Sequence, residues 1–169
     1  QSRRKYPELI RADRQLWKAI QINETGNLAL STEEYDIMQK ASGTGSYPLF
    51  IKGSPGSGKS TILMYLFSEH LYRHLRRIVK PNQKALPYPP IYLTYSGRLL
   101  EVARKSVETI MKSNHKFALA NSINFEEQYI TEEIDHSFWI FHDFLMNFLS
   151  EEQKHKFDSG TRHEYPQFR

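Results

Sequence analysis

The chain contains the sequence Gly53-Ser54-Pro55-Gly56-Ser57-Gly58-Lys59-Ser60. This is the pattern of a phosphate-binding P-loop, in which glycines let backbone amides converge on an anion and adopt positive φ angles. Lys59 supplies charge for the β and γ phosphates, and the Ser60 hydroxyl can coordinate Mg²⁺ at a helix N-terminus that favours anions. The sequence therefore predicts a site for Mg²⁺ and a nucleoside triphosphate, ATP.

The segments on either side of the glycines match the context that this pattern needs. Residues 47–52 form a short apolar run that predicts a strand, and residues 61–79 have the periodicity of an amphipathic helix. Thr61 either supports the site from behind the loop or is an ordinary helix residue. The predicted fold class is α/β: a P-loop NTPase (RecA-like) parallel sheet flanked by helices, incomplete, with an extra N-terminal helix.

Hydrophobic periodicity places further elements along the rest of the chain. It predicts a buried strand at 91–95 and helices at 8–22, 32–40, 99–111, 138–148 and from 150 onward. Residues 80–90 hold four prolines and predict a connecting loop. We expect three parts: an N-terminal helical extension at 1–29, a partial ATP-binding domain at 30–158 and a tail at 159–169.

Composition narrows the setting in which the protein works. A net charge of +4 over 169 residues suits a polyanionic partner without requiring one. The absence of cysteine excludes disulfides and thiolate zinc sites. There is no apolar run of the ~20 residues that a membrane helix needs, so no membrane is expected. We expect an intracellular protein, cytoplasmic or of the nucleoid or nucleus, and the polar ends suggest a piece excised from a larger chain.

Three segments resemble motifs of superfamily 1 DNA helicases of the UvrD/Rep type. Residues 91–98, Ile-Tyr-Leu-Thr-Tyr-Ser-Gly-Arg, resemble motif Ia, whose strand end touches DNA. Phe141-His142-Asp143-Phe144 resembles the Thr-Phe-His-Ser segment that follows in that family, with Asp143 where the family has Ser. Residues 30–35 resemble the Q motif, whose Gln reads adenine, and Glu34 stands at the position of that Gln.

The resemblance implies contacts with single-stranded DNA at five positions. These are Thr94, Tyr95, Ser96, Arg98 and His142. Thr and Ser hydroxyls can bind a phosphate, a tyrosine ring can stack on a base, and an arginine adds charge. The alternative is that Tyr95 lies in the core, Ser96 caps a helix, Arg98 is solvated and His142 is a partly buried histidine.

No catalytic acid can be assigned to the ATP site. Hydrolysis needs an apolar strand ending in acids that hold Mg²⁺ and orient water. Glu132-Glu133 is the nearest candidate, but it follows only two apolar residues and precedes the Phe-His segment, so these acids are expected beyond the C-terminus. The resemblance implies the ATP-binding portion of a helicase or translocase, with the remainder of the parent helicase as a partner. The alternative is a regulatory nucleotide switch that does not touch nucleic acid.

Overall fold

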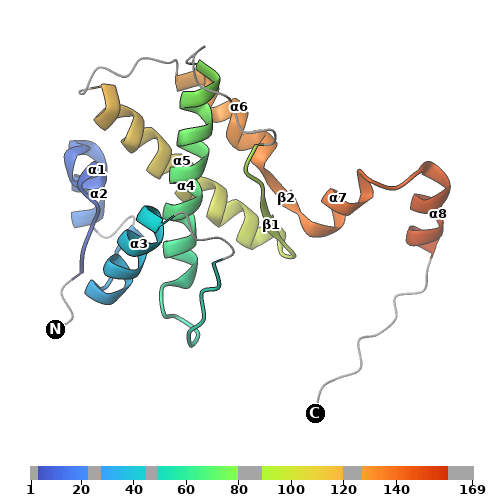
Figure 1. Cartoon of the computed structure of the whole chain (residues 1–169), viewed down its shortest axis with the longest axis horizontal. Coiled ribbons are helices and arrows are strands. Elements are labelled where there is room, and N and C mark those ends of the chain that lie inside the picture. The colour runs from blue at the N-terminus through green and yellow to red at the C-terminus, as the bar shows by residue number, and fades with distance from the viewer. Residues whose placement is uncertain (1–3, 23–27, 45–48, 80–88, 120–126, 160–169) are drawn as a thin grey trace.

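A computed structural model describes residues 4–22, 28–44, 49–79, 89–119 and 127–159, and helices make up most of this part of the chain (Figure 1). The helices are α1 (Glu8–Ala12), α2 (Arg14–Gln21), α3 (Thr32–Thr44), α4 (Lys59–Val79), α5 (Gly97–Leu119), α6 (Glu127–Ser137), α7 (Phe141–Met146) and α8 (Glu151–Ser159). The strands are β1 (Tyr92–Thr94) and β2 (Phe138–Ile140), which pair in parallel.

The predicted RecA-like sheet flanked by helices is wrong. Within the described residues the only sheet has two strands, with Leu93 of β1 opposite Trp139 of β2. Residues 49–52, expected to be the strand before the P-loop, form no strand. Leu49 and Phe50 in that segment are exposed, because no described strand lies beside them to bury their side chains. A predominantly helical core takes the place of the expected sheet.

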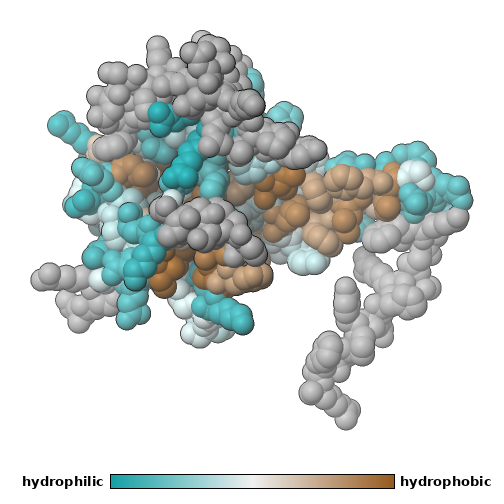
Figure 2. All heavy atoms as spheres, in the orientation of Figure 1, coloured by the Kyte–Doolittle hydropathy of each residue, from teal (hydrophilic) through white to brown (hydrophobic). Residues whose placement is uncertain are grey.

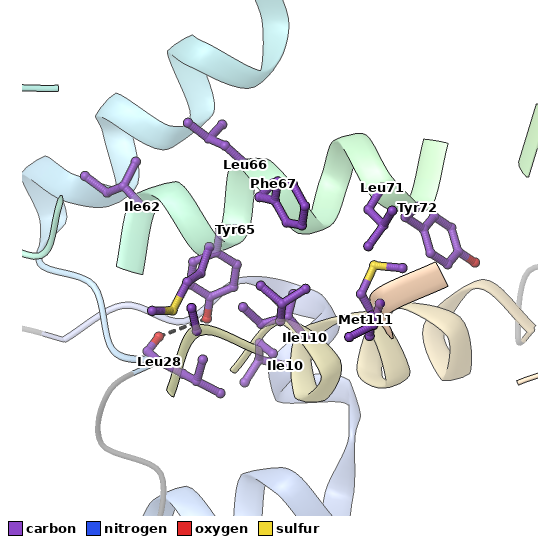
Figure 3. Close-up of a cluster of buried hydrophobic side chains, with 14 of the residues drawn as sticks. Ile10, Leu28, Ile62, Tyr65, Leu66, Phe67, Leu71, Tyr72, Ile110 and Met111 are labelled. Carbon is purple, nitrogen blue, oxygen red and sulfur yellow. Dashed lines mark hydrogen bonds between the residues drawn. The ribbon is translucent and has the colours of Figure 1, made fainter. Parts of the chain in front are cut away.

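The core lies where α4 crosses α5, and both helices are long because their apolar residues recur every three or four positions. Ile62, Leu66 and Leu71 are buried on α4, and Ile110 and Met111 are buried on α5 (Figure 3). The prediction of a helix after the loop is therefore confirmed. The helix predicted at 99–111 also exists and continues to Leu119.

The N-terminal helices belong to the same core, since Ile10 and Ile20 are buried in it. One helix was predicted for residues 8–22, but α1 and α2 meet at Asp13, which lies outside both. The Asp13 carboxylate caps α2 by accepting hydrogen bonds from the amides of Gln15 (3.1 Å) and Leu16 (3.2 Å). A side chain that satisfies free amides in this way favours a new helix start over continuation.

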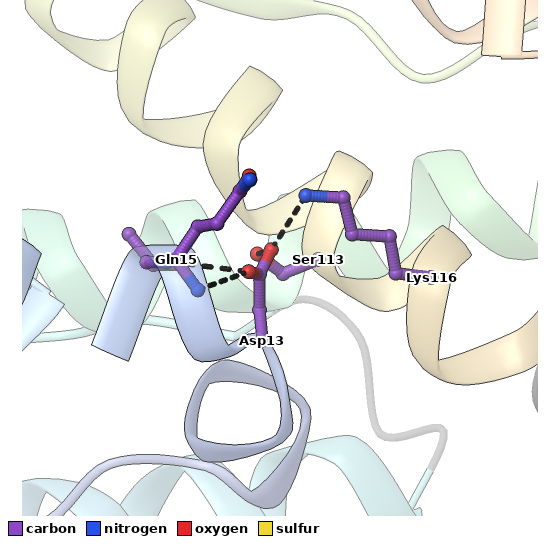
Figure 4. A network of polar contacts seen from close by, with 5 residues as sticks. Asp13, Gln15, Ser113 and Lys116 are labelled. Carbon is purple, nitrogen blue, oxygen red and sulfur yellow. Dashed lines mark hydrogen bonds and ion pairs between the residues drawn. The ribbon is translucent and has the colours of Figure 1, made fainter. Parts of the chain in front are cut away.

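Asp13 also joins the N-terminal helices to α5 (Figure 4). Its Oδ2 accepts hydrogen bonds from Lys116 Nζ at 2.9 Å and from the Ser113 hydroxyl at 3.4 Å. Burial by itself would raise the pKa of Asp13, but the bond from Lys116 and those from the α2 amides lower it overall. One carboxylate thus begins α2 and fastens it to α5.

The buried helix predicted at 138–148 is also wrong. Residues 138–140 form β2, and none of the residues of the short α7 is buried. Phe138 stacks on Tyr92 across the strand pair at 5.1 Å, and Phe67 of α4 packs edge-on against both rings at 5.5–5.6 Å. α7 and α8 extend away from the rest of the helices (Figure 1), and hydrophobic surface continues along the arm over α7 but not over the polar α8 (Figure 2).

The remaining predicted elements are partly described. α3 begins at the expected residue, and it runs through to Thr44 rather than ending near residue 40. A final helix exists as α8. Most of the predicted proline-rich loop, at 80–88, lies outside the described residues, as does the predicted tail from 160 onward. None of the described helices combines the length and the apolar character needed to cross a membrane.

Candidate functional site

The structure gives two separate reasons why glycine is needed at these positions of the predicted P-loop. Gly56 and Gly58 have φ angles of 77° and 69°, in the left-handed region that side chains disfavour. Gly53 is limited by space instead, because a Cβ there would lie 2.5 Å from the Ser57 hydroxyl oxygen. Pro55 is exposed at the turn between them. Two of the three glycines therefore meet a conformational requirement, and the third meets a requirement for space.

Lys59 folds back over its own loop. Its ammonium donates hydrogen bonds to the carbonyl oxygens of Gly53 at 2.8 Å and Ser54 at 2.6 Å, and to the Ser57 hydroxyl at 3.3 Å. The Ser57 amide in turn donates to the Ser54 carbonyl at 3.2 Å and closes a turn. These bonds hold the positive charge of Lys59 against residues 53–57 of the loop.

α4 begins at Lys59, so the helix N-terminus and the loop are continuous. Ser60 lies exposed in the first turn, and Thr61 behind it is half-buried. An exposed hydroxyl in the residue after Lys59, at the positive end of a 21-residue helix, is a group that could ligate Mg²⁺ together with phosphate oxygens. Lys59 and Ser60 also line a mainly apolar cavity of about 440 Å³, together with Ile51 and with Leu66 and Phe67 of α4.

Glu34 lies directly against the P-loop, although 24 positions separate it from Gly58 in the sequence. A Cβ added to Gly58 would fall on the Glu34 carboxylate. The same carboxylate takes part in a reciprocal capping box with Ser31 at the start of α3. The structure therefore brings the predicted Glu34 to the phosphate loop.

The predicted nucleic-acid residues gather where the two parallel strands end. Tyr95 follows β1 directly and is 82% exposed. Its ring contacts that of Phe141, which follows β2, with centroids 4.9 Å apart. His142 comes next on α7 and its side chain is 52% exposed, beside Asp143. Tyr95 therefore does not lie in the core, whereas the half-exposed His142 still fits the alternative of a partly buried histidine.

The other residues of this group have structural roles that leave their outer surfaces accessible. The Ser96 hydroxyl accepts a hydrogen bond from the Leu99 amide at 3.4 Å, and Thr94 Oγ1 accepts one from the Ser96 amide at 3.4 Å. These bonds start α5, as the helix-cap interpretation of Ser96 predicts. Arg98 is exposed in the first turn of that helix. We call the surface formed by Tyr95, Arg98, Phe141 and His142 the strand-end platform.

The acidic pair considered for metal binding lies far from the loop. Glu133 Oε1 is 3.5 Å from Nε2 of the buried His74, in the second half of α4. Ser60 and His74 are 14 residues apart on α4, which corresponds to about 21 Å at the rise of an α-helix. Among the described residues, no group of three or more His, Cys, Asp or Glu side chains could hold a metal ion. Glu132-Glu133 therefore does not complete the P-loop site.

Two features of these sites were not apparent from the sequence. Phe141 was assigned to a buried aromatic helix, and only the parallel pairing of β1 and β2 brings it to Tyr95. The available signal was that residues 138–140 are all aromatic or β-branched, which favours a strand. The contact between Glu34 and Gly58 depends on how α3 packs, and no local sequence pattern predicts it.

Comparison of the chain with protein-family models, curated proteins and solved structures finds no match.

Proposed function

We propose that this protein binds the phosphates and Mg²⁺ of a nucleoside triphosphate, ATP in the first place, through residues 53–60. The observation that supports this most is the conformation of the loop, with two glycines at positive φ and the Lys59 ammonium held over its carbonyl oxygens. A chance glycine-rich turn has no reason to combine this backbone with a lysine and a serine at the start of a long helix.

Each residue has a defined part in this binding. The loop amides and the N-terminus of α4 attract the phosphates. Lys59 exchanges its carbonyl partners for phosphate oxygens, which are stronger acceptors because they are charged. Ser60 supplies one oxygen ligand for Mg²⁺, while phosphate and water oxygens supply others. Bound Mg²⁺ would neutralise phosphate charge.

Calorimetric titration with Mg-ATP tests the proposal on Lys59→Ala. Loss of a charge-assisted hydrogen bond costs about 1.5–3 kcal/mol, so the dissociation constant should rise by about tenfold or more. Lys52→Ala is the matched control, because Lys52 is an exposed lysine just before the loop and its removal changes net charge equally. Equal affinity in the wild type and Lys59→Ala would refute the loop as the nucleotide site.

A second function, binding of single-stranded nucleic acid at the strand-end platform, is favoured by the exposed ring of Tyr95, which contacts the half-buried ring of Phe141. Aromatic faces stack on bases of any sequence, and Arg98 adds positive charge for the backbone. With ATP binding, this would make the chain the ATP-binding portion of a DNA helicase or translocase that works with the remainder of its parent protein. A regulatory switch would have the nucleotide site alone.

Fluorescence anisotropy with labelled single-stranded DNA at two salt concentrations separates these two functions. Tyr95→Ala should weaken binding by about 1–3 kcal/mol, the usual contribution of one stacked base. Phe148→Ala is the control, because Phe148 is also an exposed aromatic residue, at 71% against 82% for Tyr95, and it follows α7 rather than a strand. Absence of salt-sensitive binding by the wild type would favour the switch.

A further inference from the structure

The side chain of Glu34 is held in a defined position beside the P-loop. Its Oε2 accepts a hydrogen bond from the Ser31 amide at 2.7 Å, and the Glu34 amide donates to the Ser31 hydroxyl at 3.1 Å. This reciprocal pair fixes the first turn of α3. Both carboxylate oxygens then lie within contact distance of the space above the Gly58 Cα.

No ion pair in the described part of the chain includes this carboxylate. The ion pairs there join other residues, and Lys59, the nearest cation of the motif, bonds to loop carbonyls instead. A phosphate held by the Gly58 amide would lie within the ~8–10 Å over which charges act at ordinary ionic strength. A negative side chain therefore lies beside a site whose ligand is a polyanion.

We infer that Glu34 selects the charge state of the nucleotide, opposing free triphosphate more than the Mg²⁺ complex. This inference rests on the proposed nucleotide binding by the P-loop. Electrostatic repulsion grows with the negative charge of the ligand, and bound Mg²⁺ removes part of that charge. Glu34 thereby makes binding dependent on the metal, although the chain shows no acidic cluster among the described residues that would hold Mg²⁺ by itself.

The capping role of Glu34 can be separated from its charge. Gln serves the same position of a capping box, because its side-chain oxygen accepts the same amide hydrogen bond. Glu34→Gln therefore keeps α3 and removes only the negative charge. Glu33→Gln is the matched control, since Glu33 is exposed in the same helical turn and its removal changes the net charge by the same amount.

Calorimetry of ATP binding, in Mg²⁺ and separately in EDTA, tests the inference on the full chain. Glu34→Gln should tighten binding of free ATP by about three- to tenfold at low salt and that of Mg-ATP by less, so the preference for the metal complex falls. Glu33→Gln should leave both affinities within about twofold of wild type. Equal melting temperatures of wild type and Glu34→Gln would confirm that the cap is intact.

The outcomes distinguish this inference from the proposal on which it rests. Nucleotide binding that depends on Lys59 but shows the same Mg²⁺ preference in wild type and Glu34→Gln would overturn the role of Glu34 alone. Weaker binding by Glu34→Gln would also overturn it, because the carboxylate would then assist the ligand. Failure of every variant, wild type included, to bind ATP in either condition would overturn both.

Discussion

Gly58 is the residue at which the loop tolerates least change. It has a positive φ of 69°, and the Glu34 carboxylate occupies the space where a side chain would go. Gly56 shares the positive φ, but nothing lies within 4 Å of an added Cβ there. A substitution at Gly56 therefore costs only backbone strain, whereas one at Gly58 costs backbone strain and crowding.

We expect Gly56→Ala to lower the free energy of unfolding by about 1–2 kcal/mol, the cost of a left-handed conformation for a residue with a side chain. Gly58→Ala should cost about 1 kcal/mol more, because its methyl group must also displace the flexible end of Glu34 and break the hydrogen bond from the Ser31 amide. Urea unfolding of both variants measures the difference. In the Glu34→Ala background, Gly58→Ala should lower the free energy of unfolding by no more than Gly56→Ala does. If Gly58→Ala remains the more costly substitution there, Glu34 is not the obstacle.

At this scale the sequence singles out the residues of the loop by their spacing, but it does not show which distant residues lie beside them. The roles of Lys59 and Ser60 follow from a motif whose parts are adjacent, so spacing alone defines them. The resemblance also singled out Glu34, but as an adenine contact. Its position against Gly58 depends on helix packing, and its capping partner Ser31 could be found because a capping box is local.

Among the helices, the junction between α1 and α2 has the clearest consequence for stability. Asp13→Asn keeps an N-cap but loses the charge-assisted bond to Lys116. We expect the free energy of unfolding at pH 7 to fall by about 1–2 kcal/mol, toward the low end for such bonds because Lys116 is half exposed.

The effect of Asp13 should depend on pH in one direction. Its pKa is lowered in the folded chain, so its stabilisation is complete above the unfolded value of about 3.9 and is lost as pH falls through the folded value. Chemical unfolding of wild type and Asp13→Asn from pH 7 to pH 2 should show two curves that converge in acid. A constant gap down to pH 2 would show that the Lys116 bond is not its source.

The segment 138–148 shows why elements with mixed signals were assigned incorrectly. Its aromatic residues recur at helical spacings, and this pattern predicted one buried helix. A three-residue strand is too short to show alternation, and Phe138 is buried by rings from β1 and α4 that lie far away in sequence. Long helices such as α4 and α5 were predictable because several turns repeat the same pattern.

For the molecule as a whole, we expect ATP binding without appreciable turnover. Glu133 is engaged with His74 about 21 Å along α4 from Ser60, so the acidic pair considered for catalysis does not reach the loop. Lack of an arginine finger alone lowers the rate of hydrolysis by about 10³–10⁵, and lack of an acid that holds the metal lowers it further. A phosphate-release assay, with and without single-stranded DNA, should remain at background. Turnover at an ordinary enzymatic rate would contradict this.

The RecA-like architecture was inferred from one motif, and this explains why the inference failed. A P-loop specifies the local path of about eight residues and the start of a helix; the helix exists as α4, and two of the glycines have positive φ. A flanked parallel sheet requires several long strands, which the motif cannot report. In the described residues the apolar positions are concentrated on α4 and α5, so helix packing dominates the burial.

The parallel pairing of β1 and β2 has a consequence for how the chain folds. Roughly forty residues, including all of α5 and α6, separate the two strands, so pairing must close a large loop for only three residues on each side. Helical turns form from neighbouring residues and need no such closure. Amide hydrogen exchange should therefore be faster at Leu93 than at Leu71 in α4, which would place the strand-end platform in the part of the protein that opens first.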